Sequence, residues 1–264
     1  MQLRPYQVAA LEAVRETYRQ GHRSALVVMP TGTGKTLAYL VPALLSEGPT
    51  LVSTGTKSLQ DQLFFKDVPL VKKALGLPRK VALLKGRANY LCPYRMTLHQ
   101  EEARFLTRET AEQLQIVAHW AGRTKTGDIA ELQQIPEDAP VWPWVTSTAD
   151  NCLGTDCPNY QECPLMKARK EAQEADLVVV NHHLFFADAA LRGNGSASEL
   201  LPSANTVIFD EAHQLPEIAA AFFGDTLSTR QVQELGRDSL SEAGQTTADL
   251  ARLNQLIAAV EKGC

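Results

Sequence analysis

The sequence predicts an α/β fold built on a parallel β-sheet, and two observations support this. Short, almost continuously apolar segments alternate with helical segments, and such runs are typical of strands buried on both faces. Strands are expected at residues 24–29, 50–54, 81–85, 177–181 and 206–210. Helices are expected at residues 5–20, 35–45, 56–65 and 98–120. A length of 264 residues is enough for one large domain or two modest ones.

The composition excludes several other classes of protein. Apolar residues make up 44% and charged residues 21%, which excludes a disordered chain, collagen or a coiled coil. No run approaches the ~18 apolar residues of a membrane helix, and no apolar signal segment opens the chain, so we expect a cytoplasmic protein without a membrane partner. The net charge of −4 argues against binding nucleic acid through bulk charge, although a local basic surface remains possible.

A glycine-rich segment follows the first expected strand and opens the second expected helix. Its members are Met29, Pro30, Thr31, Gly32, Thr33, Gly34, Lys35 and Thr36. Backbone N–H groups of such a loop bind phosphate, the lysine reaches the β- and γ-phosphates of ATP, and the threonine ligates Mg²⁺. The usual pattern has glycine at its first position, where this chain has methionine. The segment therefore predicts an ATP site.

A second motif, Asp210-Glu211-Ala212-His213, ends the last expected strand. The carboxyl edge of a parallel sheet is where α/β proteins bind ligands. We expect Asp210 to hold Mg²⁺ and Glu211 to orient and deprotonate the attacking water. Alone, the motif is equally consistent with an acidic helix N-terminus, but its pairing with the phosphate loop predicts ATP hydrolysis.

Four of the five cysteines occur between the two motifs, where about 90 residues exceed what the expected strand–helix units need. They are Cys92, Cys152, Cys157 and Cys163. Four thiolates suit an iron–sulfur cluster or zinc, and one distant cysteine with three close ones is less typical of zinc. Spacing alone favours a cluster and leaves zinc or unliganded thiols open. Cys264 has no neighbouring pattern and is given no role.

Taken together, these motifs resemble the DinG/XPD iron–sulfur helicases of superfamily 2. The resemblance extends from about Leu3 to about Leu235 and is carried by five segments beside the Asp-Glu-Ala-His motif. These segments are residues 4–7, 35–42, 52–63, 84–92 and 178–184.

The resemblance implies a RecA-like motor domain, a 4Fe–4S cluster on the four cysteines, and 5′→3′ movement on single-stranded or forked DNA in replication or repair. It implies that Arg4 and Gln7 contact adenine and that His213 couples nucleotide state to a partner domain. It places His182 and His183 in a turn at the DNA-facing edge. The arginine that completes catalysis would come from a second RecA-like domain, for which the sequence shows no motif, so we expect a monomeric motor half.

The expected organisation has four parts. Residues 1–86 form the first part of the RecA-like domain, residues 87–175 the cysteine insertion, and residues 176–215 the second part with the Asp-Glu-Ala-His motif. Residues 216–264 begin a helical arch domain. Residues 122–151 are expected to be an irregular linker, and few apolar residues are expected to support the insertion, so metal ligation would supply folding free energy.

A basic run precedes the insertion and predicts a phosphate track. Its eight members are Lys66, Lys72, Lys73, Arg79, Lys80, Lys85, Arg87 and Arg95. Tyr90, Tyr94, Trp142 and Trp144 are candidates for base stacking, although the tryptophans are better explained as core residues. The alternative for the run is a merely solvated face.

Two other function classes remain open at this stage. The chain is also consistent with a non-catalytic ATP- and DNA-binding module, or with a zinc-stabilised ATPase that remodels protein or RNA. Metal content distinguishes the zinc-stabilised ATPase from the helicase and from the non-catalytic module. ATP hydrolysis distinguishes the non-catalytic module from the other two.

Overall fold

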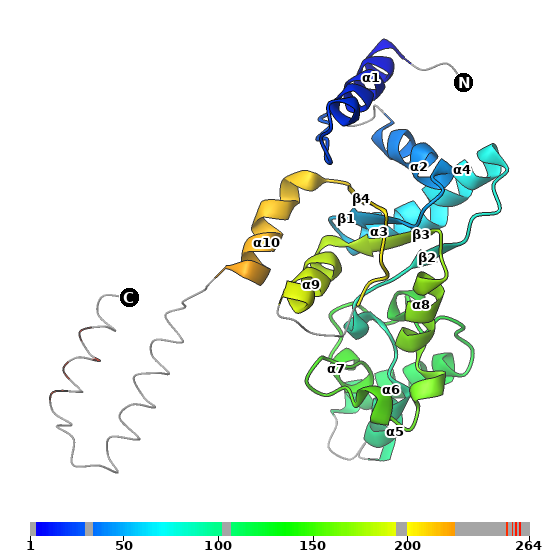
Figure 1. Cartoon of the computed structure of the whole chain (residues 1–264). Coiled ribbons are helices and arrows are strands. Elements are labelled where there is room, and N and C mark those ends of the chain that lie inside the picture. Colours follow the sequence, from blue (N-terminus) through cyan, green and yellow to red (C-terminus); the bar gives the residue numbers. More distant parts are fainter. Residues whose placement is uncertain are drawn as a thin grey trace. The chain divides into compact units, whose positions relative to one another are not determined.

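The computed structural model describes residues 4–29, 34–101, 107–193 and 200–224, with residues 252, 255, 257 and 259. The chain divides into two units, Met1–Leu215 and Pro216–Cys264 (Figure 1). The strands are β1 (Thr50–Thr54), β2 (Val81–Leu83), β3 (Leu177–Asn181) and β4 (Thr206–Phe209). The helices are α1 (Pro5–Arg19), α2 (Lys35–Leu45), α3 (Lys57–Gln62), α4 (Val68–Leu75), α5 (Pro93–Glu101), α6 (Arg108–Ala121), α7 (Trp142–Val145), α8 (Pro164–Gln173), α9 (His182–Gly193) and α10 (Leu215–Phe223).

The four strands form one parallel sheet in the order β2-β3-β1-β4. Val52 of β1 pairs with Val179 of β3 on one side and with Ile208 of β4 on the other. This sheet confirms the predicted α/β class and fits a RecA-like fold. The predicted strands 50–54 and 177–181 are confirmed, and β2 and β4 end earlier than predicted.

Alternate residues of the central strands fill two different cores, as the two-residue period of a strand requires. Val52, Leu177 and Val179 pack with Leu40 and Leu44 of α2 and with α4 on one face. The neighbouring residues of the same strands, Leu51, Val178 and Val180, pack on the opposite face with Ala172 of α8 and Phe185 of α9. The sheet is therefore covered by helices on both faces, which positions its carboxyl edge rigidly.

The prediction of a strand at residues 24–29 is wrong. This segment lies outside the sheet, and its apolar side chains face solvent, with Leu26 78% and Val28 85% exposed. Strand β4 is the edge of the described sheet on that side, and its Val207 is 41% exposed. An apolar run indicates that a segment is compatible with a strand. Forming the strand also requires hydrogen bonds to a partner strand that is distant in the sequence.

Two predicted helices are each divided in the structure. The predicted helix 56–65 corresponds to α3 and the start of a π-helical turn at Leu63–Asp67, and helical structure continues past the predicted end into α4. Thr56 caps α3 by accepting a hydrogen bond from the Leu59 amide at 3.2 Å. The predicted helix 98–120 consists of α5 and α6 with residues 102–106 outside the described part. The apolar spacing, which is continuous along both segments, did not predict the π-helical turn or the boundary between α5 and α6.

The cysteine insertion has a hydrophobic core of its own, which corrects two expectations. Residues 122–151 contain little regular structure, as expected for an irregular linker or loop, yet they are largely packed into a core. Their apolar side chains pack against α6, and the buried members are Ile129, Leu132, Ile135, Ala139, Val141, Trp142 and Val145. Burial of these residues contributes to folding beside any metal. Within the described residues, no helix combines the length and apolarity needed to cross a membrane.

Candidate functional site

The parallel strands β1, β3 and β4 end at one edge of the sheet and deliver the candidate site residues there. Asp210 follows β4 directly, and its amide donates to the Ser53 carbonyl oxygen of β1 at 2.8 Å. Gly55 follows β1 and lies against the Gln214 side chain, since a Cβ atom at Gly55 would come within 2.3 Å of Gln214 Oε1. Strand β1 and the Asp-Glu-Ala-His segment are thus in direct contact.

Helix α2 brings the phosphate-loop lysine to the acidic motif. The helix begins after Gly34, whose φ of 83° is favourable for glycine because it has no Cβ atom. Lys35 Nζ lies 3.7 Å from Glu211 Oε1, and both side chains are about 30% exposed. One turn later, the Tyr39 hydroxyl donates to Asp210 Oδ2 at 3.0 Å. Residues separated by about 175 positions in the sequence therefore share one site.

Glu211 is held by several contacts. Its amide donates to Asp210 Oδ1 at 3.1 Å, and its Oε2 lies 3.3 Å from His213 Nδ1. Its φ of 55° is the single positive value among non-glycine residues in the described part of the chain. Such a conformation costs roughly 1–3 kcal/mol and persists where surrounding contacts favour it. These contacts orient the carboxylate toward Lys35.

Tyr39 is a site residue that the motif analysis missed. Burial raises the pKa of its hydroxyl far above the ordinary value, and the charge of Asp210 and the hydrogen bond to it add to the rise. Tyr39 therefore stays protonated and remains a donor to Asp210. Its position four residues after Lys35 on an α-helix was an available signal, because residues i and i+4 share a face.

His182 connects the strands behind Asp210. It is fully buried at the start of α9, with Nδ1 2.7 Å from Ser53 Oγ and Nε2 2.9 Å from the Asp210 carbonyl oxygen. Burial is the main cause that lowers the pKa of His182, so the ring is neutral. His182 begins helix α9 rather than lying in the expected turn, and its ring packs inside the fold. His183 is exposed.

The remaining predicted nucleotide ligands are only partly described. Thr36 lies in the first turn of α2, Met29 ends the preceding described segment, and Arg4 is exposed just before α1. Gln7 lies within α1, and its side chain is outside the described part. Pro30, Thr31, Gly32 and Thr33 are outside the described residues.

The four cysteines of the insertion form no disulfide bond, and the other three lie close enough to Cys92 for their charges to affect its thiol. Burial raises the pKa of the Cys92 thiol above its ordinary value, against a hydrogen bond from the Arg95 backbone that lowers it. The charges of Cys163, Cys157 and Cys152 add to the rise. The insertion therefore gathers four thiols that were up to 71 positions apart in the sequence.

Gly127 explains how the first and last of these cysteines come together. A Cβ atom at Gly127 would meet two Pro164 carbons at 2.5 Å and the Leu91 Cβ at 3.9 Å, and φ at this position is +66°. Its carbonyl oxygen accepts from the Leu91 amide at 2.8 Å. Leu91 precedes Cys92, and Pro164 follows Cys163. The glycine thus allows the two cysteine segments to approach each other.

The described residues do not form a complete metal-binding site. No three side chains among their histidines, cysteines, aspartates and glutamates converge on a point that suits a metal ion. The donor set of four thiols is nevertheless that of an iron–sulfur or zinc site.

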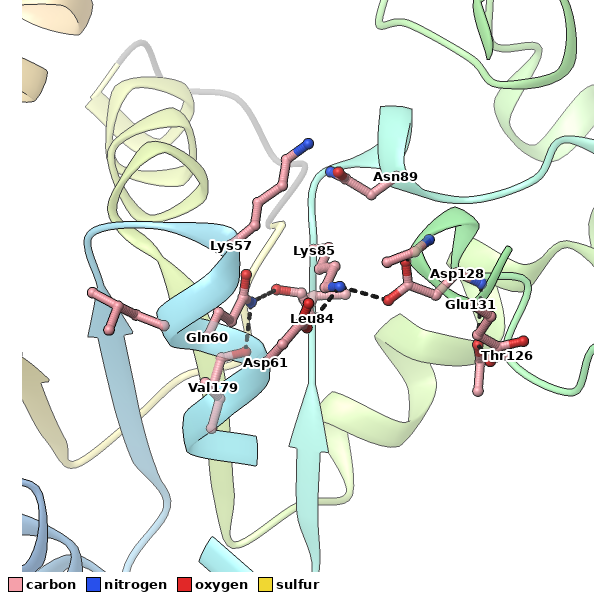
Figure 2. A network of polar contacts seen from close by, with 12 residues as sticks. Lys57, Gln60, Asp61, Leu84, Lys85, Asn89, Thr126, Asp128, Glu131 and Val179 are labelled. Atoms are coloured by element: carbon pink, nitrogen blue, oxygen red, sulfur yellow. Dashed lines mark hydrogen bonds and ion pairs between the residues drawn. The ribbon is translucent and has the colours of Figure 1, made fainter. Parts of the chain in front are cut away.

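Two members of the predicted phosphate track, Lys85 and Arg79, make contacts within the protein. Lys85 is 2% exposed, and its Nζ lies 2.7 Å from Asp61 Oδ1 of α3 and 2.7 Å from Asp128 Oδ2 of the insertion (Figure 2). The Arg79 guanidinium donates to the Leu44 and Ser46 carbonyl oxygens. The sequence predicted both as phosphate ligands, which is wrong for Lys85, because charge counting does not detect internal partners.

The aromatic candidates for base stacking also differ in how far they are buried. Tyr90 is 4% exposed and its hydroxyl oxygen accepts from the Lys85 amide, so it is not available as a stacking surface. Trp142 is a core residue, as the alternative explanation held, and Trp144 packs partly buried against the same core. Tyr94 is half-buried.

Two family matches cover the phosphate loop and the Asp-Glu-Ala-His segment. Residues 1–73 match the family described as "Type III restriction enzyme, res subunit", and residues 148–232 match the family described as DEAD_2. The chain is 52% identical over 219 residues to the ATP-dependent DNA helicase YoaA of Haemophilus influenzae, covering 83% of this chain and 34% of that protein.

Two further relatives show the same pattern of coverage. YoaA of Escherichia coli is 48% identical over 226 residues, covering 86% of this chain and 35% of that protein. The ATP-dependent helicase DinG of Mycobacterium tuberculosis H37Rv is 37% identical over 227 residues, covering 78% and 33%. The chain spans about a third of the length of these relatives. With the phosphate-loop helix and the Asp-Glu-Ala-His segment meeting at one sheet edge, these matches fit the N-terminal portion of a DinG-type superfamily 2 helicase.

Proposed function

We propose that this chain is the ATP-binding motor portion of a DNA helicase that moves 5′→3′ on single-stranded or forked DNA in replication or repair. The observation that carries the proposal is the approach of Lys35 to Glu211 at 3.7 Å. It supports one shared site for the phosphates and the attacking water. The printed names of the relatives, ATP-dependent DNA helicases, support DNA as the second substrate.

The residues present fit ATP with Mg²⁺. Lys35 and the start of α2 would bind the phosphates, and Thr36 and Asp210 would hold the metal, which supplies charge neutralisation of the phosphates when bound. Tyr39 fixes one carboxylate oxygen of Asp210 by its hydrogen bond. Glu211, oriented by Lys35 and His213, would accept a proton from water. Arg4 and Gln7 would contact adenine, as the family resemblance implies.

We propose a 4Fe–4S cluster on Cys92, Cys152, Cys157 and Cys163. Burial and the charges of the other three cysteines raise the pKa of the Cys92 thiol, the Gly127 packing brings the segments of Cys92 and Cys163 together, and binding a metal would replace the thiol protons. Zinc is the alternative for the same donors. The cluster segment, residues 87–175, would separate strands beside the sheet, and residues 216–264 would begin the arch domain.

Nucleotide binding tests the ATP site directly. Calorimetric titration of the 264-residue chain with Mg–ATP should detect binding, and Lys35→Ala should weaken it at least about tenfold, the loss expected for a charge-assisted phosphate contact. Lys80→Ala removes an exposed lysine outside the site and serves as the control. Equal affinity in Lys35→Ala and the unmodified chain would contradict the proposal.

Metal analysis tests the cysteine proposal. Anaerobically purified protein should contain iron and sulfide and absorb visible light, and each substitution Cys92→Ser, Cys152→Ser, Cys157→Ser or Cys163→Ser should remove that absorbance. Cys264→Ser is the matched control and should leave it unchanged. Stoichiometric zinc without iron would favour the remodelling ATPase, and full iron content in Cys92→Ser would exclude Cys92 as a ligand.

A further inference from the structure

His182 is a buried histidine beside the proposed nucleotide site, and both of its ring nitrogens are engaged. It is the first residue of α9, directly after β3, and it is 0% exposed. Its Nδ1 lies 2.7 Å from the Ser53 hydroxyl oxygen, and its Nε2 lies 2.9 Å from the Asp210 carbonyl oxygen. A carbonyl oxygen can only accept a hydrogen bond, so Nε2 carries a proton and is the donor. His182 therefore connects β1 to the residue that follows β4.

The direction of this donor is fixed by what surrounds the ring. Phe209, the last residue of β4, lies with its ring centroid 6.0 Å from that of His182. Phe185 of α9 packs edge-on against Phe209 at 4.8 Å. Ser53, which contacts the opposite nitrogen, is itself 0% exposed. Packing on the ring and a hydrogen bond at its far nitrogen hold a histidine in one orientation, so the Nε2–H group keeps its direction toward Asp210.

The peptide group between Asp210 and Glu211 is held at both of its polar atoms. Its carbonyl oxygen accepts from His182 Nε2, and its N–H donates to Asp210 Oδ1 at 3.1 Å. The preceding N–H, that of Asp210 itself, donates to the Ser53 carbonyl oxygen at 2.8 Å. The φ angle of Glu211 is a rotation relative to the first of these peptide groups, and its value of 55° is one that residues other than glycine adopt at a cost. The hydrogen bonds that hold the peptide group therefore support this conformation of Glu211.

We propose that His182, supported by Ser53, is a positioning residue for ATP hydrolysis, and that its Nε2–H group fixes the peptide group joining the proposed Mg²⁺ ligand Asp210 to the proposed base Glu211. The inference rests on the proposed ATP site and adds two residues that lie outside both ATP motifs. Without the donor, rotation of this peptide group would change the direction of both carboxylates at once. Catalytic groups must be held to within about 0.5 Å, so a displacement of this kind weakens both metal binding and catalysis.

The effect of Mg²⁺ on ATP affinity tests the proposal without requiring turnover. Calorimetric titration of the 264-residue chain with ATP, once in excess Mg²⁺ and once in excess EDTA, gives two Kd values, and Mg²⁺ should lower the Kd. His182→Leu removes the donor and retains an apolar side chain in its place. It should reduce the ratio of the two Kd values about two- to tenfold, the range for one hydrogen bond, and leave the Kd in EDTA unchanged. Partial unfolding would lower the stoichiometry of both titrations and would not change the ratio.

A conservative variant separates the hydrogen bond of His182 from its packing. The amide nitrogen of glutamine extends about as far from the backbone as histidine Nε2 and can donate in its place, so His182→Gln should retain the Mg²⁺ effect that His182→Leu loses. His119→Leu removes an exposed histidine of α6 and is the control, which should behave like the unmodified chain. Equal losses in His182→Gln and His182→Leu would show that the ring only fills space and would overturn the proposal.

Ser53→Ala tests the support behind the ring. It removes the hydroxyl at His182 Nδ1 and should also reduce the Mg²⁺ effect, but it should have no further effect in a chain that already carries His182→Leu, because a residue that acts through another is not additive with it. If His182→Leu does not fold, Ser53→Ala decides alone, and an unchanged ratio of Kd values would overturn the proposal.

Failure of this inference can be distinguished from failure of the proposed function. If the unmodified chain does not bind ATP, or if Mg²⁺ does not strengthen the binding, the proposed ATP site fails and this inference fails with it. If the unmodified chain shows the Mg²⁺ effect and both His182→Leu and Ser53→Ala retain it in full, only the role of His182 fails.

Discussion

At the scale of single residues, Lys85 shows how a charge is stabilised inside this fold. Burial alone would lower the pKa of its ammonium, but the hydrogen bonds and charges of Asp128 and Asp61 outweigh that effect and raise the pKa. The lysine is therefore charged at all physiological pH values. The three groups join helix α3 to the insertion.

Replacing Lys85 by methionine should destabilise the chain by about 3 kcal/mol. This is the lower end of the range for breaking a buried ion pair, and it applies because Asp61 is 32% exposed and can regain water. Urea unfolding, followed by the three tryptophans, measures the change. Lys80→Met, which breaks an ion pair between side chains that are 70% and 57% exposed, should cost less than about 1 kcal/mol. Equal costs would show that Lys85 is not held as the contacts indicate.

At the scale of elements, the insertion depends on close backbone packing as well as on its core. Gly127 combines a left-handed conformation with a contact to Pro164 that leaves no room for a side chain. The segments that carry Cys92 and Cys163 therefore meet only if this position remains glycine. The proposed metal binding by the cysteines and the folding of the insertion would be linked through that contact.

The substitution Gly127→Ala should lower the iron content of purified protein and destabilise the insertion by more than the ~1 kcal/mol of an unfavourable positive φ. Gly76→Ala is the matched control, because φ at Gly76 is +64° and nothing lies within 4 Å of its added Cβ atom. Iron and sulfide analysis with thermal unfolding measures both effects. Identical metal content in the two variants would contradict the role given to the Pro164 contact.

At the scale of the whole molecule, the basic run offers fewer exposed cations for the predicted phosphate track than its eight members suggest. Lys85 is buried and Arg79 is bound to carbonyl oxygens and to Asp176, whereas Lys66, Lys73 and Lys80 are exposed. A salt-dependent affinity is still expected, because each neutralised phosphate releases counterions.

The affinity of the chain for single-stranded DNA should fall with salt, with a slope of about 0.7 in log Kd against log salt per phosphate contacted. If Lys66 contacts a phosphate, Lys66→Gln should reduce this slope by about 0.7, the contribution of one phosphate contact. Arg79→Gln should leave the slope unchanged, since its guanidinium is used within the fold. Fluorescence anisotropy at several salt concentrations measures the slopes, and a salt-independent affinity would exclude the track.

Hydrolysis by the 264 residues alone should be slow. The family resemblance implies that a second RecA-like domain supplies a transition-state arginine, a group worth about 10³–10⁵ in rate in related phosphoryl transfers. A steady-state phosphate-release assay should show near-background turnover, and a second RecA-like domain added in trans should restore it. Glu211→Gln should then abolish turnover while Mg–ATP still binds. Rapid DNA-dependent hydrolysis by the isolated chain would contradict this prediction.

The sequence by itself determined the features whose signals are local. Residues 50–54 and 177–181 form strands as predicted, because strands buried on both faces need almost continuous apolar runs. Helix α2 begins and ends as predicted at Lys35 and Leu45. The two motifs also predicted that Lys35 and Glu211 share a site, because both bind the same nucleotide in a phosphate-loop ATP site.

Only the tertiary structure decided the features that depend on partners distant in the sequence. The pattern of residues 24–29 suits a strand, yet pairing is non-local and the segment lies outside the sheet. Lys85 has the composition of a phosphate ligand, yet Asp61 and Asp128 enclose it from two different elements. Residues 122–151 lack regular periodicity and still form a core, because burial is set by the surfaces that meet rather than by the pattern along one segment.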